Sequence, residues 1–171
     1  MNRRDLISLF FLAGCGLSTA QTTTTDPGKD VIGMVTVTVY HATNGDAGAA
    51  GQRAKAASDE VVKRLTGEQK LKFAHYRELG KDTKPLFRSY ENWAQPLPPS
   101  DEILLRFEAQ SKLSKEKGRR LDIELWLSRK KILKTDAAME RGKPLFVLGP
   151  EWRGGRLIIS AELGPIPATD P

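Results

Sequence analysis

Apolar and polar residues alternate with a period of two over much of the chain, which is the pattern of β-strands that bury one face. The first such segment is 31–40, where Val35, Val37 and Val39 occupy every second position. β-branched side chains suit a strand because they pack well on a pleated surface. The pattern therefore predicts a strand over 31–40.

One segment has a helical period instead. Between Arg53 and Leu65 the apolar positions follow helical spacing, and Lys and Arg stand between them. Such a stripe predicts an amphipathic helix with one face on the core, and Gly67 after Thr66 is a typical end. The apolar positions are Ala54, Ala57, Val61 and Leu65.

The strand pattern then continues to residue 163. Its clearest part is a pair of alternating segments on either side of the polar stretch 112–118, which predicts an antiparallel hairpin with one solvated face. We also expect strands at 71–79, 85–94, 131–137, 145–148 and 156–163, the last two joined by 149–155. Pro96, Pro98 and Pro99 close the second of these, because proline lacks the amide that a central strand needs.

These elements predict an α+β fold: an N-terminal strand, helix and strand, then antiparallel strands in a sheet or sandwich with one main helix packed on it. We expect a single domain over 31–163 and a disordered tail over 164–171. The positions with the cleanest periodicity form the predicted core: Val35, Val37, Val39, Val61, Leu65, Ile103, Leu105, Phe107, Leu121, Ile123, Leu125 and Ile159.

The N-terminus has the features of an export signal. Arg3 and Arg4 precede a short apolar run, 6–13, which is too short to span a bilayer because a span needs about 20 apolar residues. The segment Leu12, Ala13, Gly14, Cys15 resembles a bacterial lipobox, which implies a lipid on the Cys15 thiol and cleavage just before it. The alternative is an ordinary signal, residues 1–20, cut after Ala20.

Other features of this end agree with export. Residues 2–7 resemble a twin-arginine signal. Residues 21–30 are rich in Thr and contain little to bury, which predicts a flexible tether. Cys15 is the only cysteine, so no intramolecular disulfide forms. We expect the protein in the periplasm or on the outer membrane, held by a lipid if Cys15 is modified.

The chain has 27 basic and 21 acidic residues, a net charge of +6. Outside the cytoplasm such a surface meets anionic lipids, polymers or envelope proteins, and we expect no nucleic-acid partner. Lysines on edge strands also block unwanted strand addition, which is the alternative explanation. The basic residues form three clusters: Lys63, Arg64, Lys70 and Lys72; Lys112, Lys115, Lys117, Arg119 and Arg120; Arg129, Lys130, Lys131 and Lys134.

Three patterns resemble parts of known chemical sites. Gly45, Gly48 and Gly51 stand between a strand and a helix, but neither dinucleotide loops nor P-loops have this spacing, so a flexible loop capped by Asn44 or Asp46 is expected. His41 and His75 are the only histidines and approach each other if their strands pair, yet they lack a third metal ligand. We therefore expect no cofactor, metal or nucleotide.

The third pattern is the pair Asp122 and Glu124, two residues apart on the outward face of a strand. Their side chains would stand about 7 Å apart, a spacing that two glycosidase carboxylates can use. Alternating charges on a solvated strand are the commoner explanation.

The three tryptophans, Trp93, Trp126 and Trp152, are candidates for an aromatic strip that binds carbohydrate or a partner. Trp126 points away from Leu125 and Leu127, so it covers a second layer or is exposed. Packing of the helix on that face is our interpretation.

The closing segment 144–158, PLFVLGPEWRGGRLI, resembles an exported domain of planctomycete and verrucomicrobial bacteria to which no activity is assigned. The resemblance implies no catalytic residues. We expect a non-enzymatic envelope domain, anchored by lipid, that binds another envelope component. A hydrolase acting on a wall or extracellular polymer is the alternative.

Overall fold

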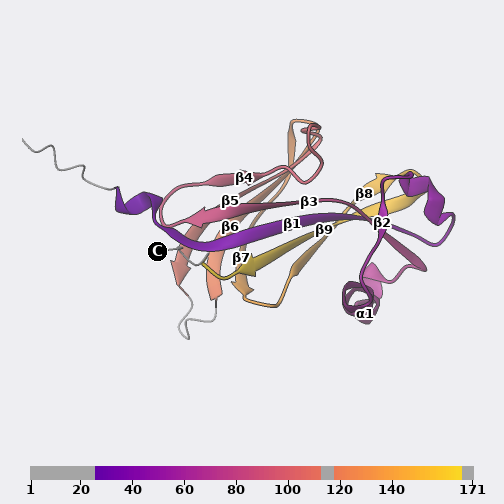
Figure 1. The fold of residues 1–171 in the computed structure, drawn as a ribbon, viewed down its shortest axis with the longest axis horizontal. Coiled ribbons are helices and arrows are strands. Elements are labelled where there is room, and N and C mark those ends of the chain that lie inside the picture. The colour runs from indigo at the N-terminus through magenta and orange to yellow at the C-terminus, as the bar shows by residue number, and fades with distance from the viewer. Residues whose placement is uncertain (1–25, 113–117, 167–171) are drawn as a thin grey trace, which may run out of the picture.

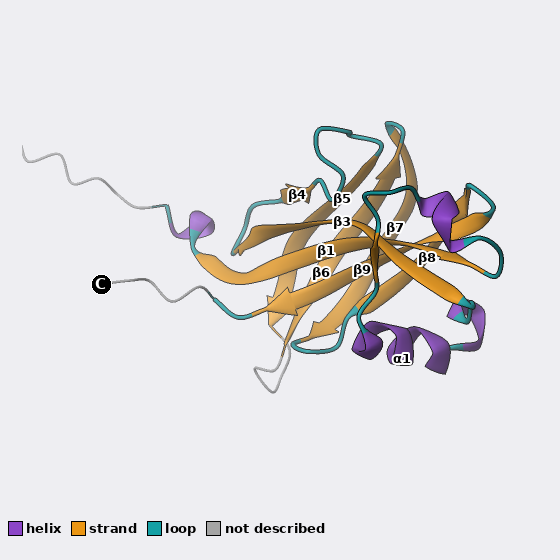
Figure 2. Ribbon diagram, turned by 45° about the vertical axis from the view of Figure 1, so that its right-hand side comes forward, coloured by secondary structure: helices purple, strands orange, loops and turns teal. Residues whose placement is uncertain are grey.

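The computed structural model describes residues 26–112 and 118–166. This part of the chain is mostly antiparallel sheet with one α-helix, and neither sheet closes on itself (Figures 1 and 2). The α+β expectation holds to this extent: the fold is mainly β with a single helix. Its elements are η1 (Pro27–Lys29), β1 (Val31–Thr43), η2 (Ala47–Ala50), β2 (Lys55–Ala56), α1 (Asp59–Gly67), η3 (Gln69–Leu71), β3 (His75–Phe87), β4 (Asn92–Ala94), β5 (Ile103–Lys112), β6 (Gly118–Leu127), β7 (Lys130–Glu140), β8 (Leu145–Trp152) and β9 (Gly155–Gly164).

The strands form two sheets. The first has the order β2-β3-β1-β9-β8 and the second has the order β4-β5-β6-β7. The first strand of the chain thus lies at the centre of the first sheet, between β3 and the last strand β9 (Figure 1). The second sheet lies behind the first in this view, and α1 packs at one end of the first sheet.

One hydrophobic core joins the facing sides of the two sheets. It combines buried residues of β1, β3 and β9 with buried residues of β4, β5, β6 and β7. All the predicted core positions on strands are buried, which confirms that part of the prediction. Leu65 and the half-buried Val61 belong to a second cluster, on the opposite face of the first sheet beneath α1.

The helix begins later than predicted. Residues 53–57 form a turn and the short strand β2, in which Lys55 lies opposite Glu78 of β3. The amide of Ala57 then donates to Tyr76 O at 3.1 Å. Ser58 is the N-cap, and its side chain accepts from the amide of Val61 at 3.4 Å. Pairing with β3 therefore outweighs the helical spacing of the alanines, and α1 ends at Gly67 as expected.

The predicted strands 71–79 and 85–94 are wrong in their boundaries. A single strand, β3, runs from His75 to Phe87 and includes Pro85, and only a short β4 follows at 92–94. Pro85 is tolerated because β3 pairs there with β1 on one side alone; β2 reaches only as far as Glu78. Residues 88–91, in the middle of the predicted strand 85–94, do not form a strand.

The later strands agree with the pattern and extend beyond it. The predicted hairpin is confirmed, with Ile103 opposite Leu127 and Phe107 opposite Ile123. The loop between β8 and β9 is shorter than predicted, because β8 continues to Trp152. Only Arg153 and Gly154 form the turn, both with positive φ, as a tight two-residue hairpin turn requires.

The predicted signal, Cys15, residues 21–25 of the tether and residues 167–171 of the tail lie outside the described residues. Residues 26–30 of the predicted tether contact the domain: the Tyr90 hydroxyl donates to Asp26 at 2.7 Å, and the Ser89 amide donates to Gly28 O at 3.0 Å. Among the described residues, no helix is long and apolar enough to cross a membrane.

Candidate functional site

A polar groove lies between the outer face of the first sheet and α1. It encloses about 250 Å³. Strands β1, β3 and β9 form its floor, α1 forms one wall, and the segment before β8 completes it. We call it the polar groove; its lining residues are Thr36, Thr38, Tyr40, Ser58, Glu60, Val61, Arg64, Glu78, Lys81, Pro144, Phe146, Ser160 and Glu162.

The sheet register explains why polar side chains meet here. Thr38 of β1 lies opposite Lys81 of β3 on one side and Ser160 of β9 on the other. One step along, Thr36 lies opposite Glu162. Because side chains two apart on a strand share a face, these residues form neighbouring polar rows on the outer face. Thr38 and Ser160 are buried there, although both are polar.

Two carboxylates in the groove, Glu78 and Glu162, form no ion pair among the described residues. Glu78 lies opposite Tyr40 across β1 and β3, and Glu162 stands at the other side of the floor. Neither forms an ion pair with a cation in the described part of the chain. Ionised carboxylates only accept hydrogen bonds, so both retain acceptor capacity for a ligand.

Tyr40 is the buried aromatic residue of the floor. Burial raises the pKa of its phenol above the usual range; a hydrogen bond with Thr38 opposes this, and the charges of Glu78 and Glu162 add to it. Tyr40 therefore remains protonated and is available as a hydrogen-bond donor. Its ring also contributes apolar surface beside Phe146.

The helix wall is held by Arg64. Its Nη2 donates to Glu60 Oε1 at 2.7 Å, and its Nη1 donates to Gly142 O at 3.0 Å. The second contact joins α1 to the turn before β8. Arg64 thus fixes the wall of the groove and is paired with Glu60. Among the described residues Glu78 and Glu162 form no ion pair, and Lys81 is the second cation of the lining.

The glycine pattern forms no anion cradle. Gly45 N donates to the Thr43 hydroxyl, and Gly48 N donates to Asp46 Oδ1 at 2.7 Å. Gly51 N donates to Gly48 O. All three amides are used within the loop. Asp46 caps η2 as the loop interpretation expects, whereas the side chain of Asn44 accepts from Ala74 N.

The two histidines lie on paired strands but do not form a site together. His41 is buried opposite Arg77, and its Nε2 lies 3.1 Å from Trp152 O. His75 is exposed opposite Thr43. The described residues contain no group of three His, Cys, Asp or Glu side chains suited to a metal ion.

Asp122 and Glu124 belong to a charged network on the outer face of the second sheet. Lys134 Nζ lies 3.4 Å from Asp122 and 3.5 Å from Glu124. Arg106 contacts Asp122, Glu108 and Glu91. Burial raises the pKa of Glu124, but hydrogen bonds from Lys131 and Trp126 outweigh it and lower the pKa. The general acid of a glycosidase needs a raised pKa, so Glu124 does not suit that role. Nor is this face simply solvated, because Glu124 is buried.

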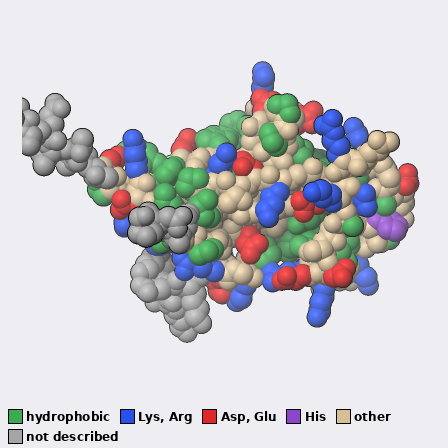
Figure 3. All heavy atoms as spheres, viewed as in Figure 1, with side chains coloured by type: hydrophobic (Ala, Val, Ile, Leu, Met, Phe, Trp, Pro, Cys, Tyr) green, Lys and Arg blue, Asp and Glu red, His purple; other side chains and the backbone are tan. Residues whose placement is uncertain are grey.

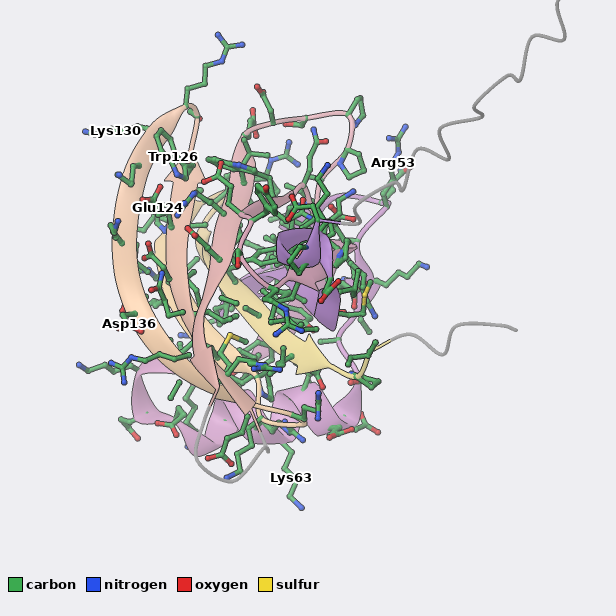
Figure 4. The ribbon with its side chains drawn as sticks, turned by 90° about the vertical axis from the view of Figure 1, so that its left-hand side faces the viewer. Arg53, Lys63, Glu124, Trp126, Lys130 and Asp136 are labelled. Atoms are coloured by element: carbon green, nitrogen blue, oxygen red, sulfur yellow. The ribbon has the colours of Figure 1, made fainter. Side chains whose placement is uncertain are left out.

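Two of the tryptophans meet on this same face. The rings of Trp93 and Trp126 are 5.9 Å apart, and Lys131 Nζ lies 5.5 Å from the centre of the Trp126 ring. Figure 4 shows Trp126 beside Glu124 on the second sheet. The interpretation that the helix covers Trp126 is wrong, because α1 packs on the other sheet. Trp152 lies apart, against His41.

The three basic clusters do not converge. Lys63 and Lys130 extend from different sides of the molecule (Figure 4). Basic and acidic side chains are interspersed on the face that Figure 3 shows. Several members form ion pairs, such as Arg120 with Asp136 at 2.8 Å and Lys131 with Glu124 at 3.2 Å. Lys115 and Lys117 lie outside the described residues.

Comparison of the chain with protein-family models, curated proteins and solved structures finds no match. The polar groove is thus defined by its geometry alone. Sequence reasoning missed it because its residues come from three strands and a helix. The one signal in the sequence is the alternation Thr36, Thr38, Tyr40, which by itself predicts only one face of the strand over 31–40.

Proposed function

We propose that the protein is a non-enzymatic binding domain of the bacterial cell envelope, exported and anchored through Cys15, that holds a sugar unit of an envelope polysaccharide in the polar groove. The observation that carries this proposal is the pair of carboxylates, Glu78 and Glu162, which form no ion pair among the described residues and stand on a floor of hydroxyl groups. Sugar hydroxyl groups supply the donors that these carboxylates lack.

The size and lining of the groove support a ring-sized ligand. Its volume of about 250 Å³ lies below the roughly 300–1,000 Å³ of sites for drug-sized molecules. Tyr40 and Phe146 offer apolar surface to the carbon face of a sugar ring, and the Tyr40 hydroxyl, Thr38 and Ser160 can donate to its oxygens. The lining has one more carboxylate than it has cations, which disfavours an anionic ligand at this position.

We also propose that the two sheets form a sandwich. The two sheets and their shared core favour the sandwich alternative among the predicted folds, with α1 as an added element on one outer face. In such a fold the outer face of a sheet is free to bind, since packing of the other sheet uses only the inner face. The polar groove lies on an outer face.

Calorimetric titration with a soluble oligomer of N-acetylglucosamine, and with the de-acetylated oligomer, tests the proposal. We expect binding of at least one of them, and a loss of about tenfold in affinity for Glu78→Gln and for Glu162→Gln, equivalent to about 1.4 kcal/mol each. Glu151→Gln, which changes an exposed carboxylate outside the groove, is the matched control. Absence of binding to both oligomers, or equal loss in the control, would contradict the proposal.

A further inference from the structure

The four edges of the two sheets differ in how they are protected. The edge strands β2 and β4 have two and three residues. The edge strand β7 carries Lys130, Lys131, Lys134 and Asp136, and its pairing with β6 has a bulge. Short length, charge and bulges are the usual means by which an edge avoids pairing with another chain.

The free part of β3 is also covered. Asn92 Nδ2 donates to Pro85 O at 3.0 Å, and the amide of Gln95 donates to Asp82 Oδ2 at 2.8 Å. Lys81 and Lys84 add charge to this stretch. The chain after β3 therefore shields it from a further strand.

The edge strand β8 has none of these protections over residues 145–148. This stretch, Leu-Phe-Val-Leu, is uncharged, and β9 alone among the described strands pairs with it. Its four side chains are all half-buried rather than covered. Phe146 and Leu148 face the helix side of the sheet, and Leu145 and Val147 face the core between the sheets.

An apolar groove follows this edge. It has a volume of about 690 Å³ and lies between η3 and β8. We call it the edge groove; its lining residues are Glu68, Gln69, Lys70, Leu71, Pro144, Leu145, Phe146 and Leu148. A strand added to β8 would place every second side chain in this groove, which is the arrangement of recognition by strand addition.

The charges around the edge groove indicate which kind of ligand it can bind. Lys70 lines it and Arg141 is exposed just before β8, and neither forms an ion pair within the described ranges. Lys143 is paired with Glu140, and Glu68 offsets one of the two unpaired cations. With Lys70 and Arg141 against Glu68, the net charge at this edge is positive, which suits an acidic ligand.

A second copy of the chain fits this edge less well than a single peptide. Antiparallel pairing of two β8 strands about a two-fold axis would bring the same face of both sheets to one side. Each η3, with its Lys70, would then stand beside the seam, where like charges meet. A single extended peptide brings no second η3 to the edge and no second Lys70, so it avoids both the steric crowding of the two η3 segments and the repulsion between the two lysines.

We propose that the free edge of β8 binds an extended peptide segment of a partner protein, with apolar residues at alternate positions and an acidic flank. The segment adds a strand to the first sheet, places its apolar side chains against Leu71 and Leu148, and directs its acidic end to Lys70 and Arg141. This interaction is separate from sugar binding in the polar groove, although Phe146 and Pro144 border both grooves.

The probe is a fluorescein-labelled synthetic peptide with two glutamates followed by alternating valine and threonine, added to the full-length chain. We expect saturable fluorescence anisotropy and new protection from hydrogen exchange in residues 145–148. Leu148→Ala and Lys70→Glu should each weaken binding about tenfold. Ile132→Ala, which truncates an exposed apolar residue on the edge strand β7, should leave it unchanged.

Lys70 is an exposed residue, so Lys70→Glu tests the proposal even if Leu148→Ala destabilises the fold. Absence of binding, protection of β7 instead of β8, or equal loss in Ile132→Ala would overturn the proposal. So would a dimer that protects β8 without peptide, because a second copy would then be the occupant. The Glu78→Gln and Glu162→Gln variants should bind the peptide normally, which separates a failure here from a failure of sugar binding.

Discussion

His41 and Trp152 lock β1 to the hairpin that ends the first sheet. Their rings meet edge to face with centroids 5.4 Å apart, and His41 Nε2 lies 3.1 Å from the carbonyl oxygen of Trp152. Since that oxygen only accepts, Nε2 carries the proton. Nδ1 is buried without a hydrogen-bond partner among the described residues. This histidine is thus a structural residue.

The first prediction concerns this contact. His41→Ala removes a fully buried ring and leaves the Trp152 carbonyl without its donor, so we expect a loss of about 2–4 kcal/mol in the free energy of unfolding. Urea denaturation measures it. His75→Ala, on the neighbouring strand but exposed, should change stability by less than about 0.5 kcal/mol. Similar effects of the two substitutions would show that His41 does not support the hairpin.

A second prediction tests the shared core. Phe107 and Leu125 are fully buried on adjacent strands of the second sheet. Phe107→Ala should cost about 3–5 kcal/mol and Leu125→Ala about 2–5 kcal/mol, because each leaves a cavity that the packed sheets fill only in part. Chemical denaturation gives the values, with the exposed Ile132→Ala as reference. A cost below about 1 kcal/mol for both would contradict the packing of the two sheets.

The charged network predicts a pH dependence. In the folded protein the pKa of Glu124 lies below its ordinary value: burial raises it, and hydrogen bonds from Lys131 and Trp126 lower it by more. The resulting stability is present above the pKa of the unfolded chain and is lost as pH falls through the folded pKa. Glu124→Gln should therefore lower the Tm at neutral pH and approach the wild type in acid.

Thermal melts from about pH 7 to about pH 3 measure this difference. Glu102→Gln, which alters an exposed carboxylate in the loop before β5, serves as the control and should follow the wild-type curve. If the Glu124→Gln curve stays parallel to the wild type at all pH values, the carboxylate is not stabilised in its charged form.

The anchor is tested by metabolic labelling. Cys15 is the chain's only thiol and stands in a lipobox-like context, so a palmitate analogue should label the wild type and not Cys15→Ala. The variant should also leave the membrane fraction. Equal labelling of both proteins would exclude Cys15 as the lipid site, and cleavage after Ala20 would then be the expected processing.

The buried core positions could be predicted from the sequence more accurately than the ends of the helix and strands. Alternation at Val35–Val39 and in the 103–127 hairpin is enforced by burial, since a shift of one residue would expose the whole apolar set. The start of the helix and the limits of β3 depend instead on pairing between distant segments, such as Lys55 with Glu78. Local spacing contains no information about such pairs.

Pairing between distant segments also decides which site residues the sequence could predict. Asp122 and Glu124 were recognised as a pair because they are close in sequence, but their partners Lys134 and Arg106 come from neighbouring strands. The polar groove depends on three strands meeting in one register. A carboxylate such as Glu162 acquires its surroundings only from the sheet order, which no single segment predicts.

The place of β1 between β3 and β9 has a consequence for biogenesis. The central strand of the first sheet is made first, and its partner β9 is made last. Until β9 is made, the side of β1 that faces β9 has no partner strand, so the first sheet cannot be completed while the chain is still growing. The complete sheet can therefore form only after nearly all of the described chain has been made. A chain stopped before β9 would leave one edge of its own central strand unpaired, and such an edge can pair with another chain.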